Sequence, residues 1–130
     1  MVVAIIDDSQ FVRILHHKLI EKIDKKIILK SYDSGESFLK SLKDGDPEIP
    51  DLVITDYDMK KLNGIDVIKK IDKYCIKNKI IDKLKVYLVS SNRELKNAII
   101  DCASNVYQGF IPKPLTRNHV INIFTRIPVL

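Results

Sequence analysis

The feature that most constrains the fold is a repeated alternation of short apolar runs with longer amphipathic segments. The apolar runs predict five strands: Val2–Ile6, Ile27–Tyr32, Leu52–Thr55, Val86–Val89 and Tyr107–Ile111. A segment with helical periodicity follows each run along the chain. Apolar strands separated by helices are typical of a parallel sheet that is covered by helices on both faces. We therefore expect an α/β fold, with residues 1–130 as a single domain.

The first amphipathic segment follows Ser9, a residue type that caps helix N-termini. Its apolar residues recur at every fourth position: Phe11, Leu15, Leu19 and Ile23. This spacing predicts an amphipathic helix. His16 and His17 on that helix have no partner at metal-ligand spacing, so we expect them on the surface, and we expect the same of His119.

Four further helices are predicted, and the first of them begins at Ser34-Gly35. Their apolar positions are Phe38, Leu39 and Leu42; Ile65, Ile68, Ile71 and Cys75; Leu95, Ala98, Ile99, Cys102 and Ala103; and Val120, Ile123, Phe124 and Ile127. Residues 76–85 are rich in lysine and lack periodicity, so we expect the end of a helix and an extended loop there.

Composition narrows the class of protein. No apolar run approaches the roughly 20 residues of a membrane-spanning helix, and no signal peptide precedes the first strand, so we expect a cytoplasmic protein whose two cysteines stay as thiols. The net charge is +5, and residues 60–85 hold nine lysines against three aspartates. There is no arginine cluster, so we expect a solvated surface without direct nucleic-acid binding, and an acidic partner is the alternative.

Polar residues end four of the predicted strands. They are Asp7 and Asp8 after the first, Asp56 and Asp58 after the third, Ser90 after the fourth and Lys113 after the fifth. Right-handed crossovers place the carboxyl ends of parallel strands along one edge, where ligands of such sheets bind. We therefore expect these groups to converge in one cleft.

This set of side chains has a recognisable chemistry. Clustered carboxylates repel one another, and Mg²⁺, which prefers oxygen ligands, removes that penalty. Carboxylates, Mg²⁺, a lysine and a hydroxyl are the components of a phosphoryl-transfer site. One carboxylate can itself be the nucleophile, and Asp56 is the most central.

The motifs that carry these residues resemble those of the response-regulator receiver domain of two-component signalling, over residues 2–127. The matching pieces are Asp7-Asp8, Asp56-Tyr57-Asp58-Met59 with Asn63-Gly64, Ser90, and Phe110-Ile111-Pro112-Lys113-Pro114. The resemblance implies a flavodoxin-like (βα)5 fold with strand order 2-1-3-4-5. It also implies a phosphorelay in which a sensor histidine kinase or phosphotransfer domain donates the phosphoryl group and an unidentified protein is the downstream target.

The resemblance assigns roles position by position. Asp56 matches the phosphoacceptor, Asp8 a direct ligand of Mg²⁺, Asp7 a ligand that acts through water, and Asp58 a ligand through its backbone carbonyl. Ser90 and Lys113 match the hydroxyl and lysine that meet the phosphoryl group. Phe110 matches the aromatic switch residue on the surface formed by the fourth helix, fifth strand and fifth helix. The Lys113–Pro114 bond is expected to be cis.

The sequence also departs from the family pattern. Lys60 stands where proline usually follows the methionine, which loosens that loop, and Phe110 has no hydroxyl. Two alternatives remain open: a pseudo-receiver that binds proteins without being phosphorylated, and a haloacid-dehalogenase-like phosphatase, whose Asp-x-Asp motif Asp56-Tyr57-Asp58 mimics. In the phosphatase family, however, the acidic pair follows that motif, and here it comes first.

Overall fold

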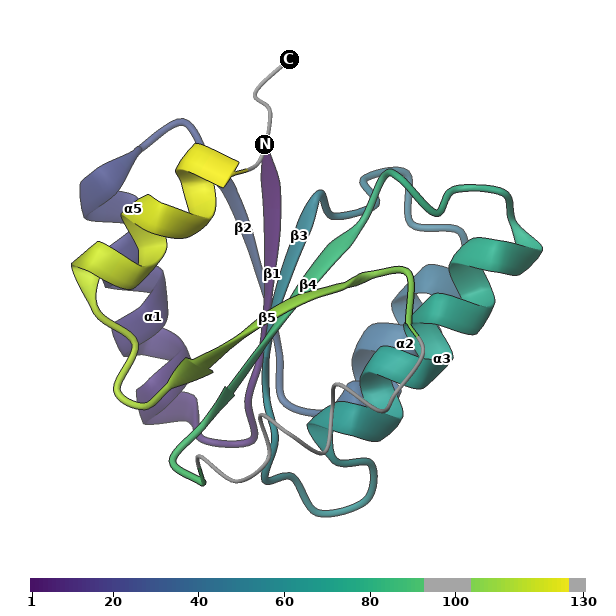
Figure 1. The fold of residues 1–130 in the computed structure, drawn as a ribbon, viewed down its shortest axis with the longest axis horizontal. Helices are drawn as coiled ribbons and strands as arrows, with labels where there is room; N and C mark the ends of the chain where they lie inside the picture. The colour runs from purple at the N-terminus through teal and green to yellow at the C-terminus, as the bar shows by residue number, and fades with distance from the viewer. Residues whose placement is uncertain (93–103, 127–130) are drawn as a thin grey trace.

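The computed structural model describes residues 1–92 and 104–126 (Figure 1). Five parallel strands form one sheet in the order β2-β1-β3-β4-β5, as the resemblance implied. The strands are β1 Val2–Ile6, β2 Ile28–Tyr32, β3 Leu52–Asp56, β4 Lys85–Ser90 and β5 Tyr107–Pro112. The helices are α1 Gln10–Ile23, α2 Gly35–Lys43, α3 Gly64–Lys77 and α5 Arg117–Arg126. The predicted helix with Leu95–Ala103, including Cys102, lies outside the described residues.

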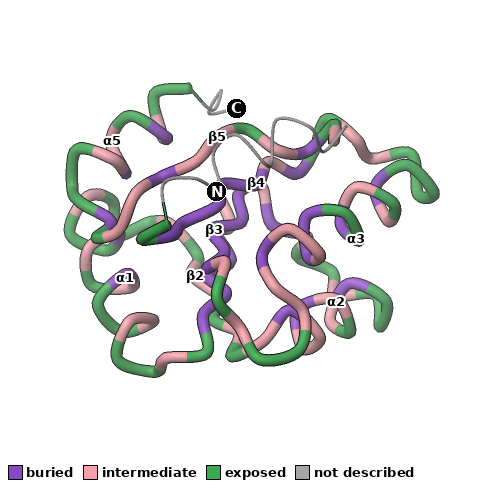
Figure 2. Tube along the Cα trace, turned by 60° about the horizontal axis from the view of Figure 1, so that its bottom comes forward, coloured by how far each residue is buried: buried purple, intermediate pink, exposed green. Residues whose placement is uncertain are grey.

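The sheet separates two apolar cores. Helices α1 and α5 cover one face, and α2 and α3 cover the other (Figure 1). Successive strand residues alternate between the faces, so Ala4 and Ile6 pack toward α2 and α3 while Val3 and Ile5 pack on the opposite side. The central strands are therefore buried on both faces, as their apolar sequences predicted (Figure 2).

The register aligns the carboxyl ends of the strands. Ile6 pairs with Thr55, so Asp7 and Asp56 follow neighbouring positions of β1 and β3. Ser90 pairs with Pro112, and Lys113 follows Pro112. The Lys113 N–H donates to the Ser90 carbonyl at 3.0 Å, which continues the ladder by one residue. The predicted polar groups consequently lie along one edge of the sheet.

Helix α1 buries a different face from the one predicted. Phe11 is 69% exposed and Leu15 48%, whereas Ile20 is fully buried. Four residues advance an α-helix by about 40° more than one turn, so residues repeated at every fourth position drift around the helix. The C-terminal members, Leu19 and Ile23, reach the core, and the two at the start do not.

The surface prediction for His16 is wrong, because its side chain points into the core. His16 is only 8% exposed, and its Nδ1 has no hydrogen-bond partner among the described residues. Burial, and secondarily the positive charge of Lys113, lowers the pKa of His16 to about 4. His17 lies 3.3 Å from Glu21 on the exposed side of the same helix, as expected. His119 is partly exposed, and its Nδ1 accepts the Thr116 N–H.

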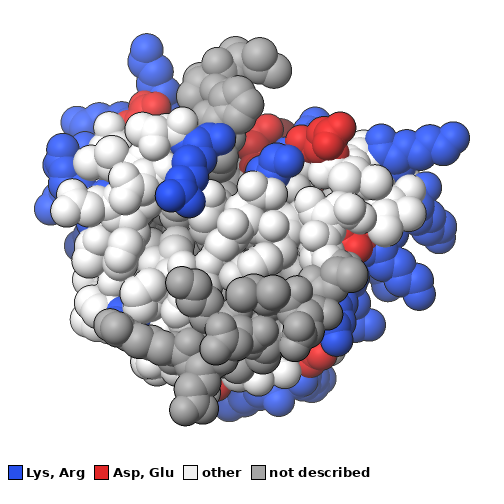
Figure 3. Space-filling model, viewed as in Figure 1, with Lys and Arg blue, Asp and Glu red and all other residues white. Residues whose placement is uncertain are grey.

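Lysines gather along one edge of the molecule. Those exposed on α3 and the segment after it are Lys69, Lys70, Lys73, Lys77, Lys79 and Lys83. Figure 3 shows them projecting from that edge into solvent, on the right of the view. Among the described residues, no helix is both long enough and apolar enough to cross a membrane.

Replacing His16 with Leu is expected to make the protein less sensitive to mild acid. The unfolded chain binds a proton at His16 near the ordinary pKa of 6.5, whereas the folded chain does so only near 4, so stability falls as the pH falls between these values. At about pH 5 this loss amounts to about 2 kcal/mol, and the Leu variant lacks it. Urea unfolding of wild type, H16L and the exposed-site control H17L at neutral and acidic pH measures the difference. Parallel pH profiles for wild type and H16L would contradict the prediction.

Candidate functional site

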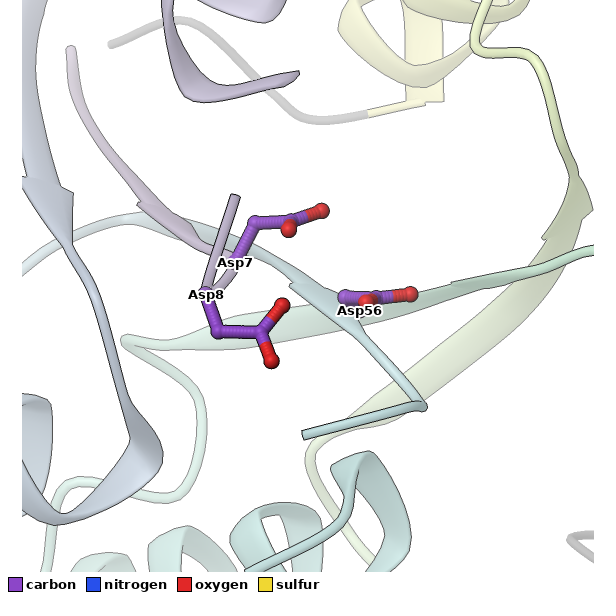
Figure 4. Close-up of side chains that lie close together, drawn as sticks. All are labelled: Asp7, Asp8 and Asp56. Atoms are coloured by element: carbon purple, nitrogen blue, oxygen red, sulfur yellow. The ribbon is translucent and has the colours of Figure 1, made fainter. Parts of the chain in front are cut away.

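Three carboxylates meet where β1 and β3 end. Asp7 and Asp8 follow β1, Asp56 is the last residue of β3, and one carboxylate oxygen of each lies within 4.8 Å of the others. Figure 4 shows the three side chains side by side at these strand ends. The sequence predicted this convergence, and the structure confirms that these three residues come together.

The cluster is buried on one side and open on the other. Asp7 is 2% exposed and Asp56 is 5% exposed, whereas Asp8 faces solvent. Asp7 Oδ1 accepts the Ser9 N–H at 2.9 Å, and its buried Oδ2 has no hydrogen-bond partner within the described chain. Burial is the main cause that raises the pKa of Asp7, and the charges of Asp56 and Asp8 add to it. The Ser9 N–H and the positive charge of Lys113 oppose this rise without cancelling it.

Lys113 supplies a cation beside Asp56. Its Nζ lies 2.9 Å from Asp56 Oδ1, and the two groups form an ion pair. Burial raises the pKa of Asp56, and Lys113 opposes that rise. Burial alone would lower the pKa of Lys113, but the contact with Asp56 and the charges of Asp7 and Asp58 together raise it. The lysine thus stays protonated beside the carboxylate.

Ser90, at the end of β4, lies on the same edge. It is fully buried, and its Oγ accepts the Asn92 N–H at 3.0 Å. Since its carbonyl also accepts the Lys113 N–H, the hydroxyl and the lysine are joined through one backbone contact. The Lys113–Pro114 peptide bond is cis, as expected. Phe110 is partly buried against the α2–α3 core.

The loop between β3 and α3 is shaped by a glycine that tolerates no side chain. A Cβ on Gly64 would lie 2.6 Å from the Asp56 carbonyl oxygen and 2.3 Å from a methyl group of Leu88. The Gly64 N–H donates to the Tyr57 carbonyl at 2.9 Å, which closes the loop. Asn63 caps α3 in a capping box with Asp66. The N-x-x-D spacing in the sequence is a signal of such a cap, but the cap was not predicted. Asp58 lies on this loop and is exposed.

Two residues near the site carry no local sequence signal. Arg13 on α1 donates from Nη1 to the Asp7 carbonyl at 2.6 Å and so ties the helix to the end of β1. Glu36 on α2 accepts the Leu62 N–H through Oε1 at 3.0 Å, across 26 residues of chain. Both contacts depend on tertiary packing, which periodicity does not encode.

The donor set fits a hard divalent cation. Three carboxylates offer oxygen ligands, one of them a buried oxygen without a partner, and one flank is open to solvent. Mg²⁺ binds through one or two carboxylates and retains several waters, which suits a half-open site of this kind. Asp7, Asp8 and Asp56 are the residues that would hold it.

The fold and the site together define a flavodoxin-like α/β protein with an acidic cluster and a lysine at the carboxyl edge of its sheet. The model of the response regulator receiver domain family matches residues 3–125. The chain belongs to this family. The match identifies the receiver domain, rather than the phosphatase alternative, over nearly the whole chain.

Two sequence relatives are each 28% identical to the chain over the aligned residues. It is 28% identical over 127 residues to the chemotaxis protein CheY of Thermotoga maritima, covering 96% of this chain and 95% of the relative. It is also 28% identical over 123 residues to a putative two-component response regulator of Arabidopsis thaliana, covering 94% of this chain but only 20% of that protein.

Solved structures share the fold. A two-component response regulator from Cytophaga hutchinsonii superposes with a TM-score of 0.82 at 24% identity, covering 97% of this chain and 95% of that one. The chemotaxis protein CheY4 of Vibrio cholerae gives a TM-score of 0.74 at 16% identity, covering 98% of both chains.

Neutralising Asp7 is expected to stabilise the metal-free protein. Asn retains the oxygen that accepts the Ser9 N–H but removes a buried charge whose pKa is raised. Because the folded pKa lies above the unfolded value, the charge destabilises the fold at neutral pH. The penalty decreases as the pH falls below the folded pKa and is lost near the unfolded value. We expect D7N to raise the melting temperature in EDTA by about 4 °C, or about 1 kcal/mol, at neutral pH.

The matched control is D82N, which neutralises an exposed aspartate on the lysine-rich segment. Thermal melts monitored by circular dichroism at neutral pH and near pH 4 compare the variants. A D7N melting temperature at or below that of wild type in EDTA would show that the carboxylates do not strain the fold.

Proposed function

We propose that the chain is a phosphorylation switch whose Asp56 accepts a phosphoryl group, with Mg²⁺ bound, from the phosphohistidine of a sensor histidine kinase or phosphotransfer domain. The observation that carries the proposal is the pairing of buried Asp56 with Lys113 beside two further carboxylates at one edge of the sheet. Membership of the receiver domain family supports the same assignment.

The chemistry is an in-line displacement at phosphorus. A carboxylate oxygen of Asp56 forms the new O–P bond as the N–P bond of the phosphohistidine breaks, and the imidazole leaves with the bonding electron pair. Lys113 holds the carboxylate in place before the transfer and meets a phosphoryl oxygen after it. Burial of Asp56 and its position at a strand end fix the direction of attack.

The acidic pair prepares the site for the donor. Asp8 would contact the cation directly, Asp7 would act through water, and the backbone carbonyl of Asp58 would be a further ligand, as the family resemblance implies. When bound, Mg²⁺ neutralises the carboxylates and the charge that develops on the phosphoryl oxygens. Without that neutralisation, three carboxylates would repel an anionic donor.

The product of the reaction is a change of conformation. A phosphoryl group adds a charge of about −1.5 to −2 in phosphorylated hydroxyl residues, and an aspartyl phosphate is comparable. Ser90 and Lys113 move toward the new oxygens, and Phe110 repacks in response. The surface that includes β5 and α5 then differs between the two states and is read by a downstream protein.

Incubation with acetyl phosphate tests the proposal directly. We expect intact-mass spectrometry to show one phosphoryl adduct, of about 80 Da, that requires both Mg²⁺ and Asp56. D56N is the matched control, because it removes the nucleophile and keeps the size of the side chain. EDTA should abolish the adduct in wild type.

A folded wild-type protein that gives no adduct is the result that would favour the pseudo-receiver. Rapid self-hydrolysis could hide the adduct, so a parallel sample contains beryllofluoride, a stable mimic of the phosphoryl group. Binding of beryllofluoride by wild type but not by D56N supports the switch, and binding by neither variant overturns it.

A further inference from the structure

The loop that follows Asp56 is fixed at its ends but not in its middle. Tyr57 N–H donates to the Val89 carbonyl at 3.0 Å, and Gly64 N–H returns to the Tyr57 carbonyl. Within the described chain, the backbone of residues 58–61 makes no hydrogen bond, and the segment contains no proline that would restrict it. The position of the Asp58 carbonyl therefore depends on what holds the second half of the loop.

Glu36 is placed to hold it. Its Oε1 accepts the Leu62 N–H at 3.0 Å, and among the described residues it is the only side chain outside β3 and α3 that bonds the backbone of this loop. The first turn of α2 is in close contact with the loop and with α3. A Cβ on Gly35 would lie 2.3 Å from a methyl group of Val67 and 3.6 Å from Leu62 Cβ.

The hydrogen bond from Leu62 to Glu36, called the tether below, lies beside the acidic cluster. Glu36 lines one hollow together with Asp8, Met59 and Lys60. Glu36 is partly buried, and α2 is fixed by its Ser34 cap, whose Oγ accepts the Ser37 N–H at 3.1 Å. The carboxylate thus reaches the loop from a rigid helix end, next to where the cation would bind.

We propose that Glu36 is a positioning residue for the cation site: by holding Leu62 it keeps the β3–α3 loop in the conformation in which the Asp58 carbonyl serves as a ligand. This inference rests on the proposed function, since it assumes that Mg²⁺ binds at Asp7, Asp8 and Asp56. Glu36 acts through the loop backbone and touches neither the cation nor the phosphoryl group.

Three variants separate the effect of the Glu36–Leu62 hydrogen bond from the effect of the negative charge of Glu36. Glu36→Gln keeps an oxygen that accepts the Leu62 N–H but loses the charge. Glu36→Met keeps the length of the side chain and loses the acceptor. Asp33→Asn removes an exposed carboxylate from the same hollow without touching the loop bond. Circular dichroism first confirms that all three variants fold.

Two measurements on each variant test the proposal. Hydrogen exchange of the Leu62 amide in EDTA reports the tether without any metal, and an NMR titration with MgCl₂ gives the dissociation constant. We expect E36M to lose protection at Leu62 and to bind Mg²⁺ about 10-fold more weakly, the scale at which supporting residues act on metal sites. E36Q and D33N should stay within about twofold of wild type in both measurements.

The outcomes distinguish this inference from the proposed function. Unchanged Mg²⁺ affinity in E36M, while wild type binds Mg²⁺ and forms the acetyl phosphate adduct, would overturn the role of Glu36 and leave the switch intact. Equal weakening in E36Q, E36M and D33N would show that charge matters and the loop bond does not. Wild-type protein that binds no Mg²⁺ overturns the metal site itself, and the role of Glu36 with it.

Discussion

The mutual repulsion of the carboxylates of Asp7, Asp8 and Asp56 is the constraint on which the rest of the structure depends. The pairing of β1 with β3 forces these groups together, because Ile6 and Thr55 are partners and the aspartates follow them. Burial deprives Asp7 and Asp56 of water, so their negative charges destabilise the fold unless a proton or a cation neutralises them. Lys113 forms its ion pair with Asp56 and acts on Asp7 only through its charge, so the buried Oδ2 of Asp7 keeps no hydrogen-bond partner among the described residues. The site is therefore built to accept positive charge.

The sequence predicted the elements that depend on simple periodicity or on the ends of strands. Buried strands such as Val2–Ile6 and Leu52–Asp56 are apolar on both faces, and a parallel sheet necessarily brings their carboxyl ends to one edge. The convergence of Asp7, Asp8 and Asp56 followed from that geometry alone and did not depend on the resemblance to a family. The strand order required the resemblance, because periodicity does not specify which strands are neighbours.

The failures have two physical causes. A residue repeated at every fourth position does not stay on one face of a helix, so Phe11 was predicted on the wrong side of α1. His16 was predicted on the surface because it has no partner at metal-ligand spacing, a criterion that does not determine burial. Contacts such as Arg13 with the Asp7 carbonyl, or Glu36 with Leu62, join elements that are adjacent only after folding. No local pattern encodes them, and they act on the backbone that carries the site.

The pairing of Lys113 with Asp56 connects stability with switching. In the unmodified protein the positive charge of Lys113 offsets the cost of burying the Asp56 carboxylate. The same ion pair raises the pKa of Lys113. A phosphoryl group on Asp56 would move the negative charge outward and increase it, so the lysine would have to follow. The Lys113 N–H is bonded to the Ser90 carbonyl, so a shift of the lysine is felt at the end of β4 as well as at β5. The contact that stabilises the buried carboxylate of Asp56 is thus the one through which a change of charge at this residue would reach the strands around it.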